Sequence, residues 1–163
     1  MDAENLKFSN ESFDFIWTWG VIHHSANTER ILEEMYRVLR PGGKATIMVY
    51  HRSFLYFYIF TALFRGILCG GFLKTGSLHQ LVQLNTDGAI ARFYWPSEWR
   101  SLVSGKGFKL EVEKIKGQKS ELFPLPASRI KRLLMNMTPN RLSRFILNTC
   151  CQGSFLITTL VKN

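Results

Sequence analysis

The stretch of residues 13–50 constrains the fold more than any other part of the sequence. Residues 13–19 are almost continuously apolar, which is typical of a strand that is covered on both faces. A polar loop and an amphipathic helix follow, and Pro41 with its two following glycines predicts a turn into a second buried strand over residues 45–50. Strand, helix and strand in this order predict a right-handed βαβ unit.

The carboxyl end of the first predicted strand is the expected place for a ligand. Parallel βαβ sheets bind ligands beyond the carboxyl ends of their strands, and the segment Trp19-Gly20-Val21-Ile22-His23-His24 stands there. In the helix that follows, Asn27 is one of three candidate N-caps, beside Ser25 and Thr28. Glu33 and Arg37 are spaced to form an i,i+4 ion pair on the solvent side of that helix.

The remaining elements follow from periodicity and capping. A short helix is predicted over residues 78–84, a further helix ends at Gly105 or Gly107, and Asp87-Gly88 indicates a turn. Residues 108–115 alternate as a half-buried strand, and residues 155–161 form a closing strand. Two basic helices are expected over residues 128–137 and 139–148, after a rigid Phe-Pro-Leu-Pro connector.

Residues 54–73 form an apolar run long enough to span a membrane. Arg65 lies near its middle, at a cost of ~2.5–3.5 kcal/mol on insertion scales, and glycines interrupt the second half. The favoured interpretation is one or two helices that cover the ligand end of the sheet. A membrane span and interfacial membrane contact are the alternatives.

The charge of the chain is concentrated in its later part. The 163 residues contain 21 Lys and Arg against 12 Asp and Glu, a net charge of +9. Residues 51–163 hold 16 of the bases and five of the acids, a surplus of +11. Such a surplus could attract nucleic acid, anionic lipid or an acidic substrate, or it could be an ordinary solvated surface.

The cysteines and the start of the chain predict a cytoplasmic protein. Cys69, Cys150 and Cys151 are odd in number and show no metal-ligand spacing, so reduced thiols are expected. The first twelve residues are polar and acidic, unlike a signal peptide. Peripheral attachment to a membrane is compatible with this expectation.

Four sequence blocks occur in a fixed order within the first 43 residues. They are Asp2-Ala3-Glu4-Asn5-Leu6-Lys7-Phe8, Ser12-Phe13-Asp14, Gly20-Val21-Ile22-His23-His24 and Arg37-Val38-Leu39-Arg40-Pro41-Gly42-Gly43. In these blocks the chain resembles the class I S-adenosylmethionine-dependent methyltransferases, in particular the methyltransferase type 11 group. A weaker similarity continues through Asp87-Gly88, residues 91–94, Ser97-Glu98 and Gly107-Phe108.

The resemblance covers only the later part of the family's fold. The family's glycine-rich loop and the acid that holds the ribose lie upstream of the first block, and no glycine pair here replaces them. The implied fold class is therefore α/β, a partial Rossmann-like sheet. It has strands 4-5-7-6 of the order 3-2-1-4-5-7-6, helices on both faces and a helical insertion after strand 5. We expect one truncated domain over residues 1–163, divided into a cofactor-side βαβ unit (1–50), an apolar helical insertion (51–86) and C-terminal helices and strands (87–163).

The resemblance also implies a cofactor site for S-adenosyl-L-methionine. Asp2 would accept a hydrogen bond from the adenine amino group, Ala3 would meet the ring edge, and Glu4 would flank the pocket. Trp19, Gly20 and Val21 would lie beneath the methionine moiety. A loop that merely closes the βα unit is the alternative for these positions.

The acceptor side of this site is expected at the ends of the strands. His24 is a candidate general base, with a structural or cofactor-shelf role as the alternative. Adjacent histidines without a carboxylate partner are poor metal ligands, so no metal site is predicted. The other expected substrate-side residues are Tyr50, His51, Arg52 and Tyr94.

The leading hypothesis for function is methyl transfer from S-adenosylmethionine to a small-molecule acceptor (EC 2.1.1.-), with this chain inactive by itself. The alternative is a membrane-peripheral basic interaction module without catalytic activity. Nucleic acid is a disfavoured partner, because clustered aromatic residues and a base-flipping motif are lacking. The strand at residues 13–19 would be a sheet edge, so self-association through it is expected.

Overall fold

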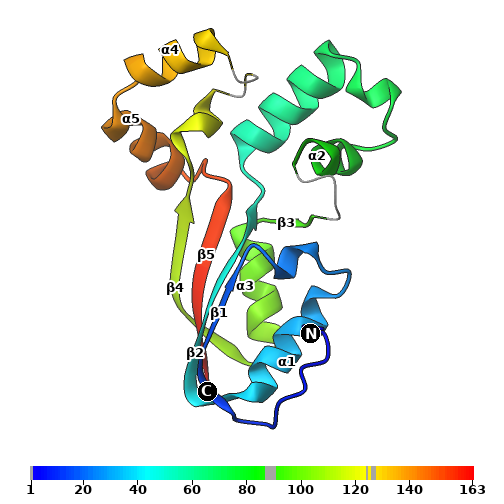
Figure 1. Cartoon of the computed structure of the whole chain (residues 1–163), viewed down its shortest axis with the longest axis vertical. Coiled ribbons are helices and arrows are strands. Elements are labelled where there is room, and N and C mark those ends of the chain that lie inside the picture. The colour runs from blue at the N-terminus through cyan, green and yellow to red at the C-terminus, as the bar shows by residue number, and fades with distance from the viewer. Residues whose placement is uncertain (1, 87–90, 124, 126–127) are drawn as a thin grey trace. The chain divides into compact units, whose positions relative to one another are not determined.

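A computed structural model describes residues 2–86, 91–123, 125 and 128–163 (Figure 1). The chain divides into two compact units. The first comprises Met1–Tyr50, Ile90–Lys114 and Leu156–Asn163, and the second comprises His51–Ala89 and Ile115–Phe155. The predicted parts 1–50 and 51–86 each fall within one unit, whereas the predicted part 87–163 is shared between both.

The first unit contains most of a five-stranded sheet, whose strands run in the order β1-β2-β5-β4 with β3 beside β2. This is the order 4-5-7-6 that the family resemblance implies. The elements are β1 (Phe13–Trp19), η1 (Ile22–His24), α1 (Thr28–Val38), β2 (Leu39–His51), β3 (Phe93–Tyr94), α3 (Pro96–Gly105), β4 (Phe108–Lys116) and β5 (Phe155–Lys162).

The βαβ unit is confirmed, because β1 and β2 pair in parallel. The closing strand β5 runs in the opposite direction beside β2. Its last residues lie at the start of β2, where the Lys162 ammonium donates to the Leu39 carbonyl over 2.8 Å. Further along, the hydroxyls of Thr46 and Thr159 lie 3.3 Å apart.

The predicted Pro-Gly-Gly turn is a bulge at the start of β2. Phe13 pairs with Leu39 but Phe15 pairs with Lys44, so the four residues 40–43 of β2 stand opposite the single residue Asp14 of β1. Gly42 has a φ of +77°, which L side chains rarely adopt. A Cβ on Gly43 would lie 2.8 Å from the Arg40 carbonyl oxygen, so the backbone closes on itself there.

Helices cover one face of the sheet in the first unit. In Figure 1, α1 and α3 lie side by side on this face, and the ammonium of Lys106 after α3 lies 2.8 Å from Glu29 and Glu33 of α1. The opposite face of β1 is open, since Phe15, Trp17 and Trp19 are exposed. One prediction was therefore wrong for this strand: β1 is not covered on both faces.

The second unit is helical. Its helices over the predicted ranges 78–84, 128–137 and 139–148 are confirmed, while the Asp87-Gly88 turn and the two prolines of the connector lie outside the described residues. None of the helices among the described residues is long and apolar enough to cross a membrane. The elements are the π-helix η2 (Phe54–Leu68), η3 (Gly71–Leu73), α2 (Leu78–Thr86), η4 (Lys119–Leu122), α4 (Arg129–Met137), α5 (Asn140–Arg144) and η5 (Phe145–Thr149).

Candidate functional site

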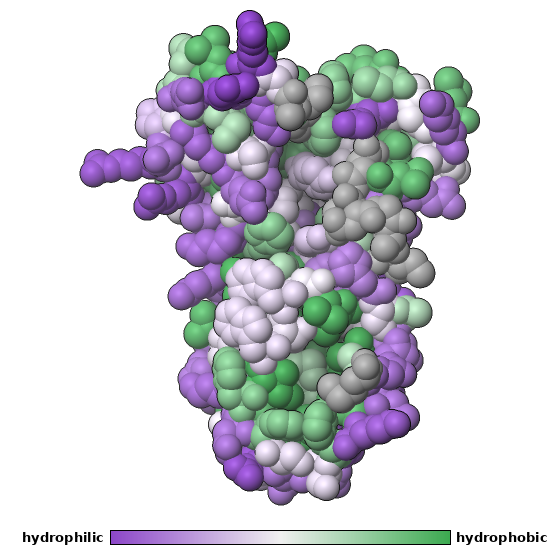
Figure 2. Space-filling model, in the orientation of Figure 1, coloured by the Kyte–Doolittle hydropathy of each residue, from purple (hydrophilic) through white to green (hydrophobic). Residues whose placement is uncertain are grey.

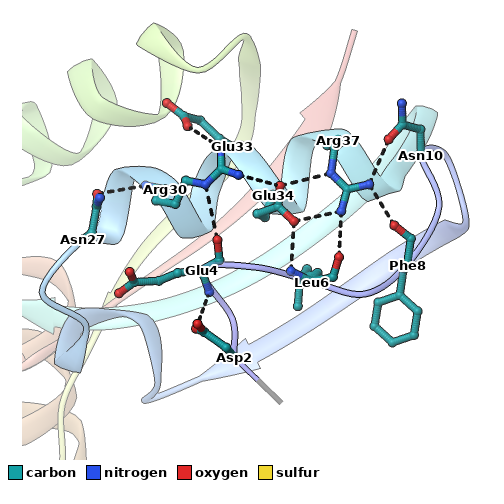
Figure 3. Close-up of polar contacts among 10 residues, drawn as sticks. All are labelled: Asp2, Glu4, Leu6, Phe8, Asn10, Asn27, Arg30, Glu33, Glu34 and Arg37. Carbon is teal, nitrogen blue, oxygen red and sulfur yellow. Dashed lines mark hydrogen bonds and ion pairs between the residues drawn. The ribbon is translucent and has the colours of Figure 1, made fainter.

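Two side chains of α1 hold the N-terminal segment, residues 2–10, along the helix (Figure 3). The Arg37 guanidinium donates to the carbonyls of Leu6 and Phe8 over 2.9 and 2.8 Å and to the Asn10 side-chain oxygen over 2.8 Å. The carboxylate of Glu34 accepts from the Leu6 backbone N–H over 2.9 Å. We call Glu34 and Arg37 with these partners the Glu34–Arg37 cluster. It fixes the segment mainly through its backbone, with Asn10 as the one side chain among these partners.

The cluster keeps a buried carboxylate ionised. Glu34 is buried, and Arg37 donates to both of its oxygens over 3.0 and 2.8 Å. These bonds favour the charged form and outweigh the penalty of burial, so the pKa of Glu34 falls from 4.5 to about 2. The same interaction raises the pKa of Arg37. Both groups therefore stay charged over the physiological pH range.

The helix-face prediction needs one correction. Glu33 does not pair with Arg37 as its i,i+4 spacing indicated. Its carboxylate lies 2.8 Å from Lys106 and 3.3 Å from Arg30. Arg37 turns instead to Glu34, because the N-terminal segment offers it three acceptors on that side of the helix.

The expected cofactor residues at the chain start lie next to the loop that follows β1. The exposed Asp2 accepts from the Glu4 backbone N–H over 2.9 Å, and Ala3 between them is half-buried. The Glu4 carboxylate accepts from the Ser25 hydroxyl, and its carbonyl accepts from the Arg30 side chain over 3.3 Å. The structure thus brings Glu4 to the loop beyond the carboxyl end of β1, with Asp2 hydrogen-bonded to its backbone.

The other expected cofactor residues end β1. Gly20 has a φ of +71°, so a residue with a side chain would be strained there, and this conformation ends the strand. Trp19 stacks on Trp17 with ring centroids 5.2 Å apart, and Val21 is exposed. These side chains face solvent and could approach a bound molecule.

A cluster of aromatic and histidine rings closes the turn after β1. The ring of the buried His23 lies 3.9 Å from that of Tyr50 at the end of β2 and 4.3 Å from that of His24. His24 meets Tyr50 edge-on at 5.9 Å, and Tyr50 stacks on Phe93 at 5.2 Å. Two expected substrate-side residues, His24 and Tyr50, therefore lie together.

Tyr94 joins this turn through hydrogen bonds that the sequence did not reveal. Its hydroxyl donates to the Thr28 hydroxyl over 3.0 Å, and Thr28 donates to the Ile22 carbonyl over 3.2 Å. The Arg92 backbone N–H donates to the His23 carbonyl over 2.9 Å. Thr28 and Phe93 were thus missed as site residues. In the sequence, Phe93 and Tyr94 stand out only as an aromatic pair. The residues that they contact, Tyr50 and Thr28, are remote in sequence.

His51 and Arg52 belong to the second unit. His51 is buried, and its Nδ1 lies 2.7 Å from the Gly153 carbonyl oxygen, which is a structural contact. The Arg52 guanidinium lies over the Phe57 ring at 5.5 Å. Because His51 is engaged in packing, we leave it out of the site proposed below.

An apolar cavity of about 260 Å³ lies in the first unit beside β1. Sequence patterns gave no sign of it, because it forms only where the N-terminal segment folds over β1 and α1. The cavity is lined by Leu6, Phe8, Phe13, Phe15, Ile16, Met35 and Val38.

No group of three or more metal-ligating side chains occurs within the described ranges.

Comparison with known proteins finds a similarity to methyltransferases within the first unit. Residues 1–47 match the model of a methyltransferase domain. The chain is 27% identical over 111 residues to a ubiquinone/menaquinone biosynthesis C-methyltransferase of Geotalea daltonii, a match that covers 66% of this chain and 46% of that protein. It is 34% identical over 53 residues to phosphoethanolamine N-methyltransferase 2 of Caenorhabditis elegans, covering 32% of this chain and 12% of that one. The chain spans less than half the length of these curated relatives.

Solved structures show the same fold over the whole chain. A Haloferax volcanii methyltransferase in complex with the Trm112 activator matches 99% of this chain with a TM-score of 0.60 and 16% identity, over 59% of its own length. The 1,6-didemethyltoxoflavin-N1-methyltransferase of Burkholderia thailandensis, solved with S-adenosylhomocysteine, matches 100% of this chain with a TM-score of 0.52 and 14% identity, over 49% of its length.

Proposed function

We propose that this chain takes part in methyl transfer from S-adenosylmethionine to a small-molecule acceptor. The chain has the fold of the class I S-adenosylmethionine-dependent methyltransferases and their domain signature in residues 1–47. The observation that carries the proposal is the Glu34–Arg37 cluster. It holds Leu6 and Phe8 of the signature segment against α1, close in the chain to Asp2, Ala3 and Glu4. A fixed backbone at this place is what recognition of a planar ring requires.

The residues present fit the adenosine side of the cofactor. The Asp2 carboxylate is exposed and could accept from an adenine amino group, while Ala3 and Glu4 would border the ring. Trp19, Gly20 and Val21 would lie beneath the methionine part. When bound, the cofactor supplies an activated methyl group on its sulfonium, so the task of these residues is to bind and orient.

The acceptor would lie near His24, Tyr50 and Tyr94. These rings surround the turn at the ends of β1 and β2, where an α/β sheet binds its ligands. We assign His24 a positioning role, because its ring packs edge-on against Tyr50. Relatives named for phosphoethanolamine and for ubiquinone/menaquinone biosynthesis support a small-molecule acceptor.

We further propose that the 163-residue polypeptide by itself holds the cofactor weakly and self-associates. Its sequence contains no glycine-rich loop after a strand, the feature that holds the methionine end. β1 is an end strand of the sheet, with Phe15, Trp17 and Trp19 exposed in a row. Such an edge is a template for pairing with another chain.

Ultraviolet crosslinking of radiolabelled S-adenosylmethionine tests the cofactor site, since it captures weak complexes. We expect label on residues 2–4 or 19–21, and we expect S-adenosylhomocysteine to compete. Asp2→Asn should lower the labelling, whereas Asp14→Asn, at an exposed acid of β1 that pairs with Arg40, should leave it unchanged. Label confined to the second unit, or label that the competitor does not displace, would overturn the proposal.

A further inference from the structure

The second unit carries a charge that its own acids cannot balance. Its sequence ranges contain ten Lys and Arg against two Asp and Glu, a net charge of +8. Of the two acids, Glu121 is turned inward, where its carboxylate accepts from the backbone N–H and hydroxyl of Ser154 over 3.1 and 2.9 Å. Its burial raises its pKa, so it opposes the positive field still less.

The apolar face of α4 is turned to solvent. Ile130, Leu133 and Met137 recur at i, i+3 and i+7, so they lie on one side of the helix. Their exposed fractions are 66%, 60% and 72%. In a water-soluble protein such a stripe normally faces the core. We call these three residues the α4 face.

Basic side chains surround this face. Arg129 and Lys131 flank the apolar stripe of α4 in helical projection, and a groove of about 540 Å³ is lined by Ser128, Arg129, Lys131, Arg132 and Met135. Arg141 and Arg144 are exposed on α5. Figure 2 shows purple side chains beside green ones over the region of α4 and α5.

We propose that the second unit docks onto the surface of an anionic lipid bilayer through the α4 face. An amphipathic helix with an apolar stripe between bases lies in the bilayer interface, with its aliphatic side chains inserted and its bases at the headgroups. A lipid surface provides both an apolar layer and negative charge at every point. Single-stranded RNA would instead require stacked aromatic side chains, and α4 has none. The proposal rests on these residues and does not depend on methyl transfer.

Vesicle flotation of the full 163-residue chain tests the charge requirement. We expect binding to phosphatidylcholine vesicles that contain phosphatidylglycerol, and little binding to phosphatidylcholine alone. Each base near an anionic surface contributes about 1 kcal/mol, so Arg129→Gln and Arg132→Gln should each weaken partitioning about fivefold. Lys109→Gln and Lys114→Gln, at exposed bases of β4 in the first unit, are the matched controls and should have no effect.

A second pair of variants tests the apolar requirement. Leu133→Ser should reduce flotation, whereas Trp17→Ser, at an exposed residue of β1 in the first unit, should not. Circular dichroism of each variant checks that it folds. Binding that is equal for neutral and anionic vesicles, or lost only in Trp17→Ser, would overturn the proposal. Binding to an RNA oligonucleotide but to neither kind of vesicle would overturn it in favour of a nucleic-acid surface.

Discussion

The two units differ in how far their basic residues are balanced by acidic ones. The first has eleven Lys and Arg against ten Asp and Glu, a net charge of +1, whereas the second has ten against two. In the first unit the charges pair across elements, as between Lys44 of β2 and Glu111 of β4 at 2.7 Å and between Arg100 of α3 and Glu113 of β4 at 2.8 Å. In the second unit a shortage of acids makes such pairing impossible for most bases.

The difference teaches that similar numbers of bases serve different purposes. Paired charges in the first unit help to fix one element against another, above all in the Glu34–Arg37 cluster. Unbalanced charges in the second unit contribute little to its folding and remain available to an external partner. Substitutions of charged residues should therefore change the stability of the first unit, and in the second unit they should change the binding of an external partner.

The largest stability effect is expected from Arg37→Ala. It leaves the buried Glu34 carboxylate without its main donor and releases the backbone of residues 6–10. Breaking a buried ion pair costs 3–5 kcal/mol, and we expect about 3 kcal/mol because Arg30 still reaches Glu34 at 3.4 Å. Urea unfolding followed by tryptophan fluorescence measures it, since all four tryptophans lie in the first unit.

Arg40→Ala is the matched control within the same unit. Arg40 pairs with Asp14 at 2.8 Å, but both side chains are more than half exposed. Exposed pairs contribute about 0–1 kcal/mol, so the loss should stay below 1 kcal/mol. Equal losses for the two variants would contradict the distinction between a buried and an exposed pair.

The pH dependence of the stability of the first unit should reflect the ionisation of Glu34. Its pKa is about 2 in the folded chain against 4.5 as its ordinary value. The folded pKa is depressed, so the stabilisation is fully present above pH ~4.5 and is lost as the pH falls toward 2, at most about 3 kcal/mol. Glu34→Gln should flatten the acid limb of a stability–pH curve measured by tryptophan fluorescence. An acid limb identical to that of the parent chain would refute this.

The close approach of Gly153 to the backbone of Lys116 should make the second unit sensitive to a side chain at this position. A Cβ on Gly153 would lie 2.3 Å from the backbone carbonyl of Lys116, so Gly153→Ala forces two segments apart. Overpacking of this kind costs about 1–3 kcal/mol. At Gly76 a Cβ would approach only the flexible Gln80 side-chain oxygen, at 3.7 Å, so Gly76→Ala should change the free energy of unfolding by less than about 0.5 kcal/mol. A dye on Cys69, after Cys150 and Cys151 are replaced by serine, would follow unfolding of this unit alone.

The smallest stability effect is expected at Leu73, which is 92% exposed in the second unit. Leu73→Ser should change the free energy of unfolding by less than about 0.5 kcal/mol, because it removes no buried surface. The Cys69 dye would again provide the measurement. A loss above 1 kcal/mol would show that the apolar surface of the second unit does contribute to its folding.

Periodicity predicted the elements of both units, because each buried face repeats at the spacing of its helix or strand. The strand order followed from the family resemblance. The open face of β1 could not be predicted, because an apolar run indicates that a strand prefers burial but not what covers it. Trp17 shows this, since it reads as a core residue and is 60% exposed.

The role of the candidate site residues stays a prediction, and their contacts came from the structure alone. His24 and Tyr50 were expected to lie near each other from the topology of parallel strands, and they do. The partner of Arg37 could not be foreseen, because i,i+3 and i,i+4 spacings both suit an ion pair on an isolated helix. The choice depends on carbonyls of residues 6 and 8, which reach α1 only in the folded unit.

The position of β5 between β2 and β4 has a consequence for synthesis on the ribosome. The hydroxyls of Thr46 and Thr159 meet only after more than a hundred intervening residues have been made, and the same holds for Lys162 and Leu39. At translation rates of about 5–20 residues per second, β2 would wait roughly 5–20 s with one edge unpaired. During that interval the edge of β2 that later pairs with β5 stays open in the nascent chain, which is then most in need of a chaperone.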